Sequence, residues 1–302
     1  ALAEAPGCDI AGIGIGALGP CPVLLDEALR PLGPSPLFAL DPRAEAFRHL
    51  LAATQGLPDA QLGPDHALPK LFWLRHETPA RLLRATQVCD ATGFLVAQLT
   101  GQAVMDPVTL CDYQAGGLVS PVPLARVVAG DSVAGGLTAT AAARLGLPAG
   151  TPVAAGSYDS YVDVAGTGAR TAGEGCVLLG STLILGCVAG IAAAPEGLRA
   201  TPHLGPGWFV GGWTSTAGSL LRWSRATHGE AAATAAASLP PGAGGLLMLP
   251  YFAGERAPHW DSQARGAVVG LSLATTPAEL HRAALDAVAL SARDLTERLA
   301  GG

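Results

Sequence analysis

The sequence is poor in charged and aromatic side chains. Only 14% of its 302 residues are Asp, Glu, Lys or Arg, and 5% are Phe, Trp or Tyr. Lys70 is the single lysine, and the net charge is −6. A chain without a basic run lacks the electrostatic footprint of a nucleic-acid partner, so we exclude that class. With 49% hydrophobic residues, intrinsic disorder is excluded as well.

Cysteine and histidine patterns that indicate a metal are also missing. None of the six cysteines forms a C-x-x-C pair or stands at zinc-finger distance from a histidine, and the seven histidines are scattered. We therefore predict no structural metal site. Free cysteines in apolar stretches fit a reducing cytoplasm, which is the compartment we expect, although the sequence leaves one or two disulfides open.

A membrane span is not expected either. Residues 176–195 run without a charge, but Gly180, Ser181 and Thr182 interrupt the run. Its apolar pieces are only four or five residues long, which favours two buried strands around a turn over a spanning helix. We also expect no signal peptide at the N-terminus.

Glycine and proline are abundant, with 40 and 24 residues, so the chain needs many turns and favours a mixed α/β protein. The length suggests two domains. Strands are predicted within 9–18, 23–26, 37–40, 153–155, 176–179, 183–188, 208–213, 246–250 and 267–271. Helices are predicted over 42–53, 68–76, 90–99, 157–168, 215–228, 231–238 and 277–300, with short helices and loops over 102–150. Asp90 would cap the helix over 90–99, which would end near Gly101. The last helix is amphipathic, with an apolar stripe that includes Ala284, Val288 and Leu295.

Residues 14–19 match the pattern G-x-G-x-x-G, and Asp41 follows at the distance of a ribose-binding acid. A dinucleotide site would require this pattern to open a helix over residues 20–29. Pro20 and Pro22 would break such a helix, and residues 23–26 resemble a strand. We therefore favour a glycine-rich strand and turn over a nicotinamide-dependent dehydrogenase.

Two short segments carry candidate chemistry. In residues 156–160 a buried strand leads an acid, Asp159, to the start of a helix, where it is either catalytic or a helix cap. Asp163 lies on the same helical face. Residues 180–182 (Gly-Ser-Thr) join two apolar runs, as either a simple hairpin turn or a loop that cradles phosphate oxygens. The spacing alone leaves both pairs of alternatives open.

A third segment, residues 254–266, is dense in charge for this chain. It contains Glu255, Arg256, Asp261 and Arg265. Because arginine pairs well with carboxylates in structural roles, we favour a salt-bridged loop here over a reactive site.

Taken in order, these segments resemble the FGGY family of carbohydrate kinases. The likeness covers essentially the whole chain and is greatest to a xylulose-kinase-like branch with an Ala-Leu-Gly-Pro-Cys turn, residues 17–21. It is carried by residues 10–26, 41–43, 69–74, 99–101, 150–156 with Asp159, 180–182, 254–258 through 265–266, and 282–283.

The resemblance implies an α/β protein of the actin-like ATPase (ribonuclease H-like) fold, with two domains around a cleft. Residues 1–164 would form the sugar-binding domain and residues 165–302 the nucleotide-binding domain. The implied reaction is transfer of the γ-phosphate of ATP, with Mg²⁺, to a hydroxyl of a ketopentose or related polyol. We expect no nucleic-acid or membrane partner, and a homodimer is left open.

The resemblance also assigns roles to individual residues. Asp159 would be the general base. The sugar would be bound by the turn Ala17, Leu18, Gly19 and Pro20 together with Trp73, Tyr158 and Asp159. The ATP phosphates would be bound by Gly180, Ser181 and Thr182.

The chain departs from the family pattern in three places. No Asp-x-Gly-Thr phosphate loop precedes Ile10, and the sequence stops before a Gly-rich adenosine motif, so we expect both domains to be incomplete. Gly19 and Pro20 stand where glycerol kinases carry Arg-Glu and typical xylulose kinases Met-His, which leaves the sugar open. A non-catalytic sugar-binding or regulatory remnant is therefore the alternative to a kinase.

Overall fold

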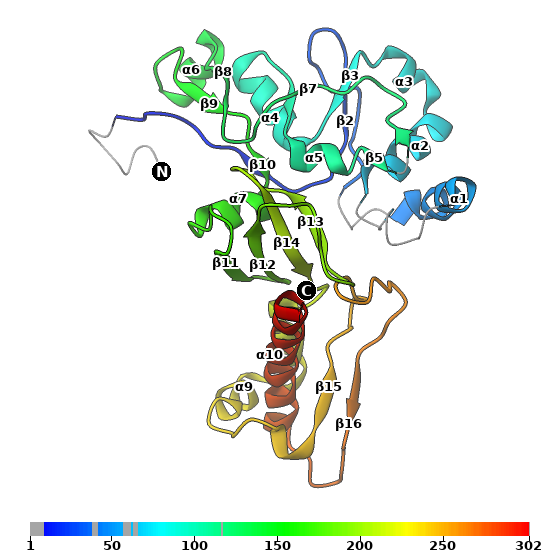
Figure 1. Cartoon of the computed structure of the whole chain (residues 1–302), viewed down its shortest axis with the longest axis vertical. Helices are drawn as coiled ribbons and strands as arrows, with labels where there is room; N and C mark the ends of the chain where they lie inside the picture. Colours follow the sequence, from blue (N-terminus) through cyan, green and yellow to red (C-terminus); the bar gives the residue numbers. More distant parts are fainter. Residues whose placement is uncertain (1–8, 38–41, 57–61, 63–65, 116, 302) are drawn as a thin grey trace. The chain divides into compact units, whose positions relative to one another are not determined.

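The computed structural model describes residues 9–37, 42–56, 62, 66–115 and 117–301. The chain divides into two compact units, Ala1–Gly166 and Thr167–Gly302, which Figure 1 draws in blue to green and in green to red. The domain boundary expected from the sequence, between residues 164 and 165, lies close to this division. Each unit is described by itself below.

The described residues of the first unit form five two-stranded pairs surrounded by helices (Figure 1). The pairs are β1 (Gly16–Ala17) with β10 (Ser157–Tyr158), β2 (Val23–Leu25) with β3 (Gln87–Cys89), β4 (Val104–Met105) with β7 (Arg126–Val127), β5 (Gln114–Ala115) with β6 (Leu118–Val119), and β8 (Val133–Gly136) with β9 (Pro152–Ala154). The helices are a 3-10 turn (Pro42–Ala44), α1 (Glu45–Gln55), α2 (Ala67–Glu77), α3 (Pro79–Arg84), α4 (Ala91–Thr100), α5 (Pro107–Cys111), α6 (Ala139–Leu145) and α7 (Asp159–Gly166).

Helix α4 shows how local sequence sets these elements. The Asp90 carboxylate accepts the Ala91 N–H at its start, and Gly101 ends it with a left-handed φ of 75°, as the sequence predicts. Only glycine fits at position 93, because a Cβ there would lie 2.0 Å from the carbonyl oxygen of Val104. The helix therefore packs directly on the backbone of β4.

The structure corrects three sequence predictions in this unit. The helix predicted over 157–168 begins at Asp159, because the buried Ser157 and Tyr158 are extended and pair with β1. The predicted strands near residues 9–18 and 23–26 do not pair with each other, since β1 pairs with β10 and β2 with β3. Residues 102–150 contain the strands β4 to β8 in addition to short helices. The strand predicted over 37–40 falls mostly outside the described residues.

The strand β2 also excludes a dinucleotide-binding site at residues 14–19. A dehydrogenase fingerprint requires a helix over residues 20–29, whereas residues 23–25 form β2. The interpretation of residues 14–19 as a glycine-rich strand and turn is confirmed.

The second unit is built on one antiparallel sheet in the order β11-β12-β14-β13. Its elements are β11 (Gly175–Leu179), β12 (Leu183–Ala189), β13 (Arg199–Pro202), β14 (Trp208–Trp213), α8 (Gly218–His228), α9 (Glu230–Ala236), a 3-10 turn (Ala243–Gly245), β15 (Leu247–Leu249), β16 (Ala267–Val269) and α10 (Pro277–Gly301). Residues 176–195 thus form two strands around a turn, as predicted. No helix among the described residues is long and apolar enough to cross a membrane.

A buried apolar cluster joins the sheet of the second unit to its helices. It joins Leu183 and Leu185 of β12, Leu220 of α8, and Ala284 and Leu295 of α10. Figure 1 shows α10 running along the β15–β16 ribbon, with α9 on its other side. The apolar stripe predicted for the last helix therefore forms the centre of this core.

Candidate functional site

Two predicted site segments far apart in the sequence are neighbours in the first unit. Strands β1 and β10 run parallel, with Gly16 opposite Ser157 and Ala17 opposite Tyr158. Because parallel strands leave a sheet at the same end, the turn after Ala17 and the acid after Tyr158 emerge together. A Cβ on Gly16 would lie 3.6 Å from the Cα of Asp159, which shows how closely the two backbones approach.

Asp159 is the first residue of α7, and its side chain is exposed. Its Oδ1 accepts the N–H of Ser160 at 2.7 Å. Asp163, one helical turn later, is also exposed. The structure therefore gives Asp159 both the local capping contact and the accessibility that a proton acceptor needs.

The turn that follows β1 is shaped by the ring of Tyr158. A Cβ on Gly19 would lie 2.0 Å from the Cε1 of Tyr158 and 2.9 Å from the Oδ1 of Asp90. No side chain fits at position 19. Of the neighbouring residues, Leu18 is 42% exposed and Pro20 is buried. The turn therefore offers mainly backbone and the Leu18 side chain to a ligand.

A buried polar network lies beneath this turn. The Lys70 ammonium donates to the carbonyl of Pro20 at 2.8 Å. One carboxylate oxygen of Asp90 accepts the Cys21 N–H and the Tyr113 hydroxyl, each at 2.8 Å. Burial raises the pKa of the Asp90 carboxyl to about 6, although these donors and the charge of Lys70 act to lower it. The sequence predicts Asp90 only as a helix cap, and nothing in it connects Lys70 with the turn.

The two predicted aromatic site residues differ in their surroundings. Tyr158 is 4% exposed, and its hydroxyl has no hydrogen-bond partner among the described residues. Burial raises the pKa of this phenol well above its ordinary value. Trp73 is half-buried on α2, three residues after Lys70, with the Arg43 guanidinium 4.2 Å from its ring centroid. Tyr158 thus joins the turn directly, whereas Trp73 lies on the helix that supplies Lys70.

In the second unit, Gly180, Ser181 and Thr182 form the turn between β11 and β12. Its carbonyls are occupied by backbone donors at the start of α8. Gly218 N–H donates to the Gly180 oxygen at 3.0 Å, and Ala217 N–H donates to the Ser181 oxygen at 2.9 Å. This contact requires a glycine at position 218, since a Cβ there would lie 2.5 Å from the Gly180 oxygen.

The outward side of the same turn carries donors. The Arg222 guanidinium, exposed on α8, donates to the Ser181 hydroxyl at 2.9 Å. Within the described part of the chain, the Ser181 and Thr182 amides donate to no protein acceptor. Two amides, a hydroxyl and an arginine side by side favour the binding of an anion. Sequence reasoning missed Gly218 and Arg222, because only the fold brings the start of α8 to this turn.

A site made of protein ligands alone for Mg²⁺ would need several acidic side chains close together. Among the described residues, no three His, Cys, Asp or Glu side chains come together as a metal site. Mg²⁺ commonly binds through substrate phosphates, waters and one or two carboxylates. The donors of the turn of residues 180–182 fit a phosphate group, through which Mg²⁺ would be held.

The charged segment 254–266 makes structural contacts. The Oε1 of Glu255, a residue 3% exposed, accepts the Ser215 and Arg256 N–H groups at 2.6 and 2.8 Å. The Arg256 guanidinium donates to the Thr214 carbonyl at 2.7 Å. These bonds fix the segment that leads into α8, and so support the interpretation as an ordering loop.

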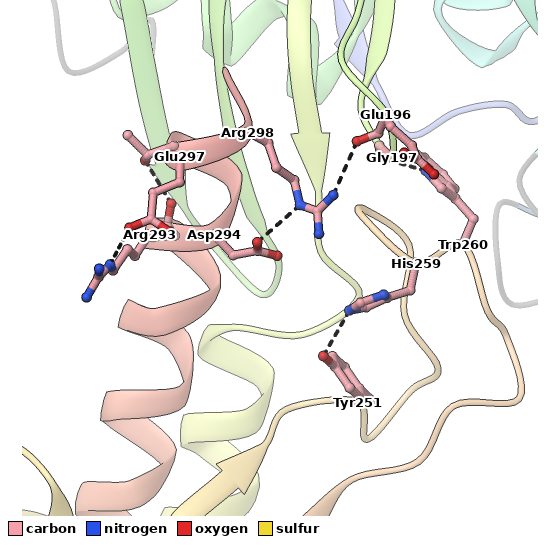
Figure 2. A network of polar contacts seen from close by, with 11 residues as sticks. Glu196, Gly197, Tyr251, His259, Trp260, Arg293, Asp294, Glu297 and Arg298 are labelled. Carbon is pink, nitrogen blue, oxygen red and sulfur yellow. Dashed lines mark hydrogen bonds and ion pairs between the residues drawn. The ribbon is translucent and has the colours of Figure 1, made fainter. Parts of the chain in front are cut away.

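Figure 2 shows the rest of that loop anchored in the same way. The Tyr251 hydroxyl and the His259 ring lie 3.1 Å apart, and the Trp260 indole donates to the Gly197 carbonyl at 2.8 Å. Arg298 of α10 bonds Asp294 at 3.1 Å. A pocket of about 240 Å³ lies here, lined in part by Tyr251, His259 and Glu255 of the charged segment, whereas none of the residues assigned to the sugar, the proton transfer or the ATP phosphates lines it.

Comparison with known proteins shows which proteins share this fold and these two turns. Residues 176–301 match the model of the C-terminal domain of the FGGY family of carbohydrate kinases. The chain is 27% identical to a xylulose kinase of Klebsiella pneumoniae over 94% of its own length and 64% of the relative's. It is 28% identical to a ribulokinase of Shouchella clausii over 76% of its own length and 48% of the relative's.

A solved structure supports the same assignment. The crystal structure of a xyloylose kinase from Brucella ovis superposes with a TM-score of 0.83 at 26% identity, covering 97% of this chain and 65% of that one. The chain is therefore similar to the FGGY family of carbohydrate kinases, and to its xylulose kinases in particular, and it has their actin-like ATPase fold. It spans about half to two thirds of the length of these relatives.

Proposed function

We propose that the chain is an ATP-dependent sugar kinase that phosphorylates a hydroxyl of a ketopentose or related polyol. The observation that carries this proposal is the register of β1 with β10, which brings the turn after Ala17 and the carboxylate of Asp159 to the same end of two parallel strands. Residues 1–164 would bind the sugar and residues 165–302 the nucleotide.

In this mechanism Asp159 accepts the proton of the sugar hydroxyl as its oxygen attacks the γ-phosphate in line. Phosphoryl transfer needs little covalent chemistry from a protein, so one placed base and good charge stabilisation are enough. The bond from Ser160 to the Oδ1 of Asp159 orients the carboxylate at the start of α7. The exposure of this side chain leaves it open to a substrate.

The sugar would lie against the turn Ala17, Leu18, Gly19 and Pro20, with Tyr158 and Trp73 as neighbouring aromatic residues. Since Gly19 has no room for a side chain, the turn would bind hydroxyls through its backbone. The names of the relatives, xylulose kinase and ribulokinase, support a ketopentose.

The ATP phosphates would bind at Gly180, Ser181 and Thr182. The Ser181 and Thr182 amides, the Ser181 hydroxyl and the guanidinium of Arg222 are the donors that would hold them. Mg²⁺ bound to the phosphates would neutralise the charge that develops during transfer.

The test is ADP release by the purified 302-residue chain with MgATP over a panel of ketopentoses and polyols. Asp159→Asn should reduce sugar-dependent release by about 10³-fold or more, because the proton acceptor is lost while the side-chain shape is kept. Asp163→Asn is the matched control, since it removes an exposed carboxylate one turn along the same helix, and we expect its release to stay within about twofold.

Two results would count against the proposal. Equal activity of Asp159→Asn and the unchanged chain would exclude Asp159 as the base. Sugar binding that gains nothing from MgATP, with no ADP release, would instead support a non-catalytic sugar-binding chain.

A further inference from the structure

We infer that Lys70 and Asp90 are positioning residues that hold the sugar-binding turn by clamping a single peptide bond, the one between Pro20 and Cys21. The inference rests on the proposed function for its consequence, since the turn is the proposed sugar contact. The clamp itself rests on geometry within the first unit. Neither residue would touch the sugar; both would act through the backbone of the turn.

The two ends of this peptide are held by opposite charges. The Lys70 ammonium donates to the Pro20 carbonyl at 2.8 Å, and the Asp90 carboxylate accepts the Cys21 N–H at 2.8 Å. Carbonyl oxygen and amide hydrogen are the negative and positive poles of the peptide dipole. A cation at one pole and an anion at the other therefore oppose any rotation of this peptide.

Both charged groups are buried where water cannot replace them. Lys70 and Asp90 are each 1% exposed. Lysine and aspartate are almost never fully buried unless paired, because removal of a charge from water is costly. A helix cap at position 90 needs only a polar oxygen, and a core position on α2 needs only an apolar side chain. Capping and packing alone do not account for these two buried charges, whereas their attraction for each other together with the clamped peptide does.

The clamp also connects three elements to the turn. Lys70 comes from α2, and Asp90 joins β3 to α4 while its Oδ1 accepts the Ala91 N–H at 2.8 Å. Tyr113, fully buried, donates its hydroxyl to the same oxygen of Asp90 that holds Cys21. The turn is thereby fixed relative to the core of the first unit, from residues 50 and 69 positions away in the sequence.

The consequence for the substrate is a preorganised backbone. Only Pro20 separates the clamped peptide from Gly19, which packs on the ring of Tyr158 next to Asp159. Rotation of the clamped peptide would move the turn away from the general base. Loss of the clamp should therefore weaken sugar binding more than it slows the chemical step once sugar is bound.

The experiment compares Lys70→Met, Asp90→Asn and Tyr113→Phe with Arg81→Met. Arg81 is the matched control, because its guanidinium donates to the carbonyl of Pro34, in a different loop, at 3.0 Å. We expect the KM for the sugar to rise about tenfold in Lys70→Met and in Asp90→Asn, and about threefold in Tyr113→Phe. The kcat and the KM for ATP should stay within about twofold, and Arg81→Met should change none of the three.

A second readout is independent of catalysis. Hydrogen exchange of the peptide that contains Cys21 should be slow in the unchanged chain and in Arg81→Met, and at least about tenfold faster in Asp90→Asn. Tyr113→Phe, which removes one hydroxyl and no charge, provides a folded variant if either charge removal unfolds the unit.

The outcomes separate the two proposals. If the unchanged chain releases no ADP with any sugar, the proposed function fails, and hydrogen exchange alone decides whether the clamp exists. If the chain is active but its sugar KM is unchanged in Lys70→Met and Asp90→Asn, the clamp does not position the turn. A parallel loss of kcat and of ATP affinity, or an equal effect of Arg81→Met, would overturn the inference in favour of a general structural role.

Discussion

The two turns proposed to bind substrate are held in different ways. The turn of residues 17–20 is fixed by buried side chains from distant helices, Lys70 and Asp90. The turn of residues 180–182 is fixed by backbone bonds, through its own hairpin and the first amides of α8. The first turn can therefore be altered by changing side chains beneath it, whereas the second depends on close backbone packing.

The largest effect expected from this difference is a pH-dependent stability. The pKa of Asp90 is raised from 3.8 to about 6 in the folded chain. Below about pH 4 the protonated carboxyl therefore adds about 3 kcal/mol to the free energy of unfolding. This contribution is lost as the pH rises through about 6. The Asp90→Asn variant has no titrating group at this position, so its free energy of unfolding should not show this loss between pH 4 and pH 7. Urea unfolding of both chains at pH 4 and pH 7 measures it, and parallel pH profiles would refute the buried titration.

The next effect tests the packing of the first turn. Gly19→Ala should destabilise the chain by about 1–3 kcal/mol, because its Cβ would overlap the ring of Tyr158. Gly14→Ala is the control, with no atom within 4 Å of its Cβ, and should cost about 0.5 kcal/mol or less. Denaturant unfolding provides the comparison. Equal midpoints for the two variants would show that the turn is not constrained by Tyr158.

A smaller effect is expected at the second turn. Gly218→Ala places a Cβ 2.5 Å from the Gly180 carbonyl, a backbone atom that cannot swing aside. The higher helix propensity of alanine offsets part of this overlap, so we expect a net loss of about 1 kcal/mol. Gly190→Ala in the same unit, with open space around its Cβ, is the control. A stabilised Gly218→Ala would mean that the hairpin does not rest on α8.

The smallest change in stability should accompany a clear change in function. Arg222 is exposed, and its removal should alter the free energy of unfolding by less than about 0.5 kcal/mol. Arg222→Met should nevertheless raise the KM for ATP, by about three- to tenfold, if Arg222 holds a phosphate. Arg225→Met, three residues along α8, is the matched control in steady-state kinetics. An unchanged KM for ATP in both variants would remove Arg222 from the proposed nucleotide site.

Local features were the ones that the sequence predicted. The hairpin around residues 180–182 follows from two apolar runs and a turn, and α4 follows from its Asp90 cap and its terminal Gly101. These features depend on residues close together in the chain. The family resemblance added the order of the segments, and it led to the fold that the comparisons then supported.

Features that depend on distant contacts were not predictable. Tyr158 was expected in a helix, yet it is extended because burial and pairing with β1 override its local preference. Lys70 and Asp90 gave no sign that they hold one peptide bond, because nothing in their own neighbourhoods points to Cys21. Arg222 was missed since only the fold brings it to Ser181.

The burial of Lys70 has a practical consequence for chemical labelling. It is the only lysine in the chain and is 1% exposed, so the folded first unit shields the sole side-chain amine. An amine-selective reagent should modify Lys70 only when the region around Pro20 opens. The rate of this modification, read by mass spectrometry with and without sugar, would report the opening equilibrium of the turn without any mutation.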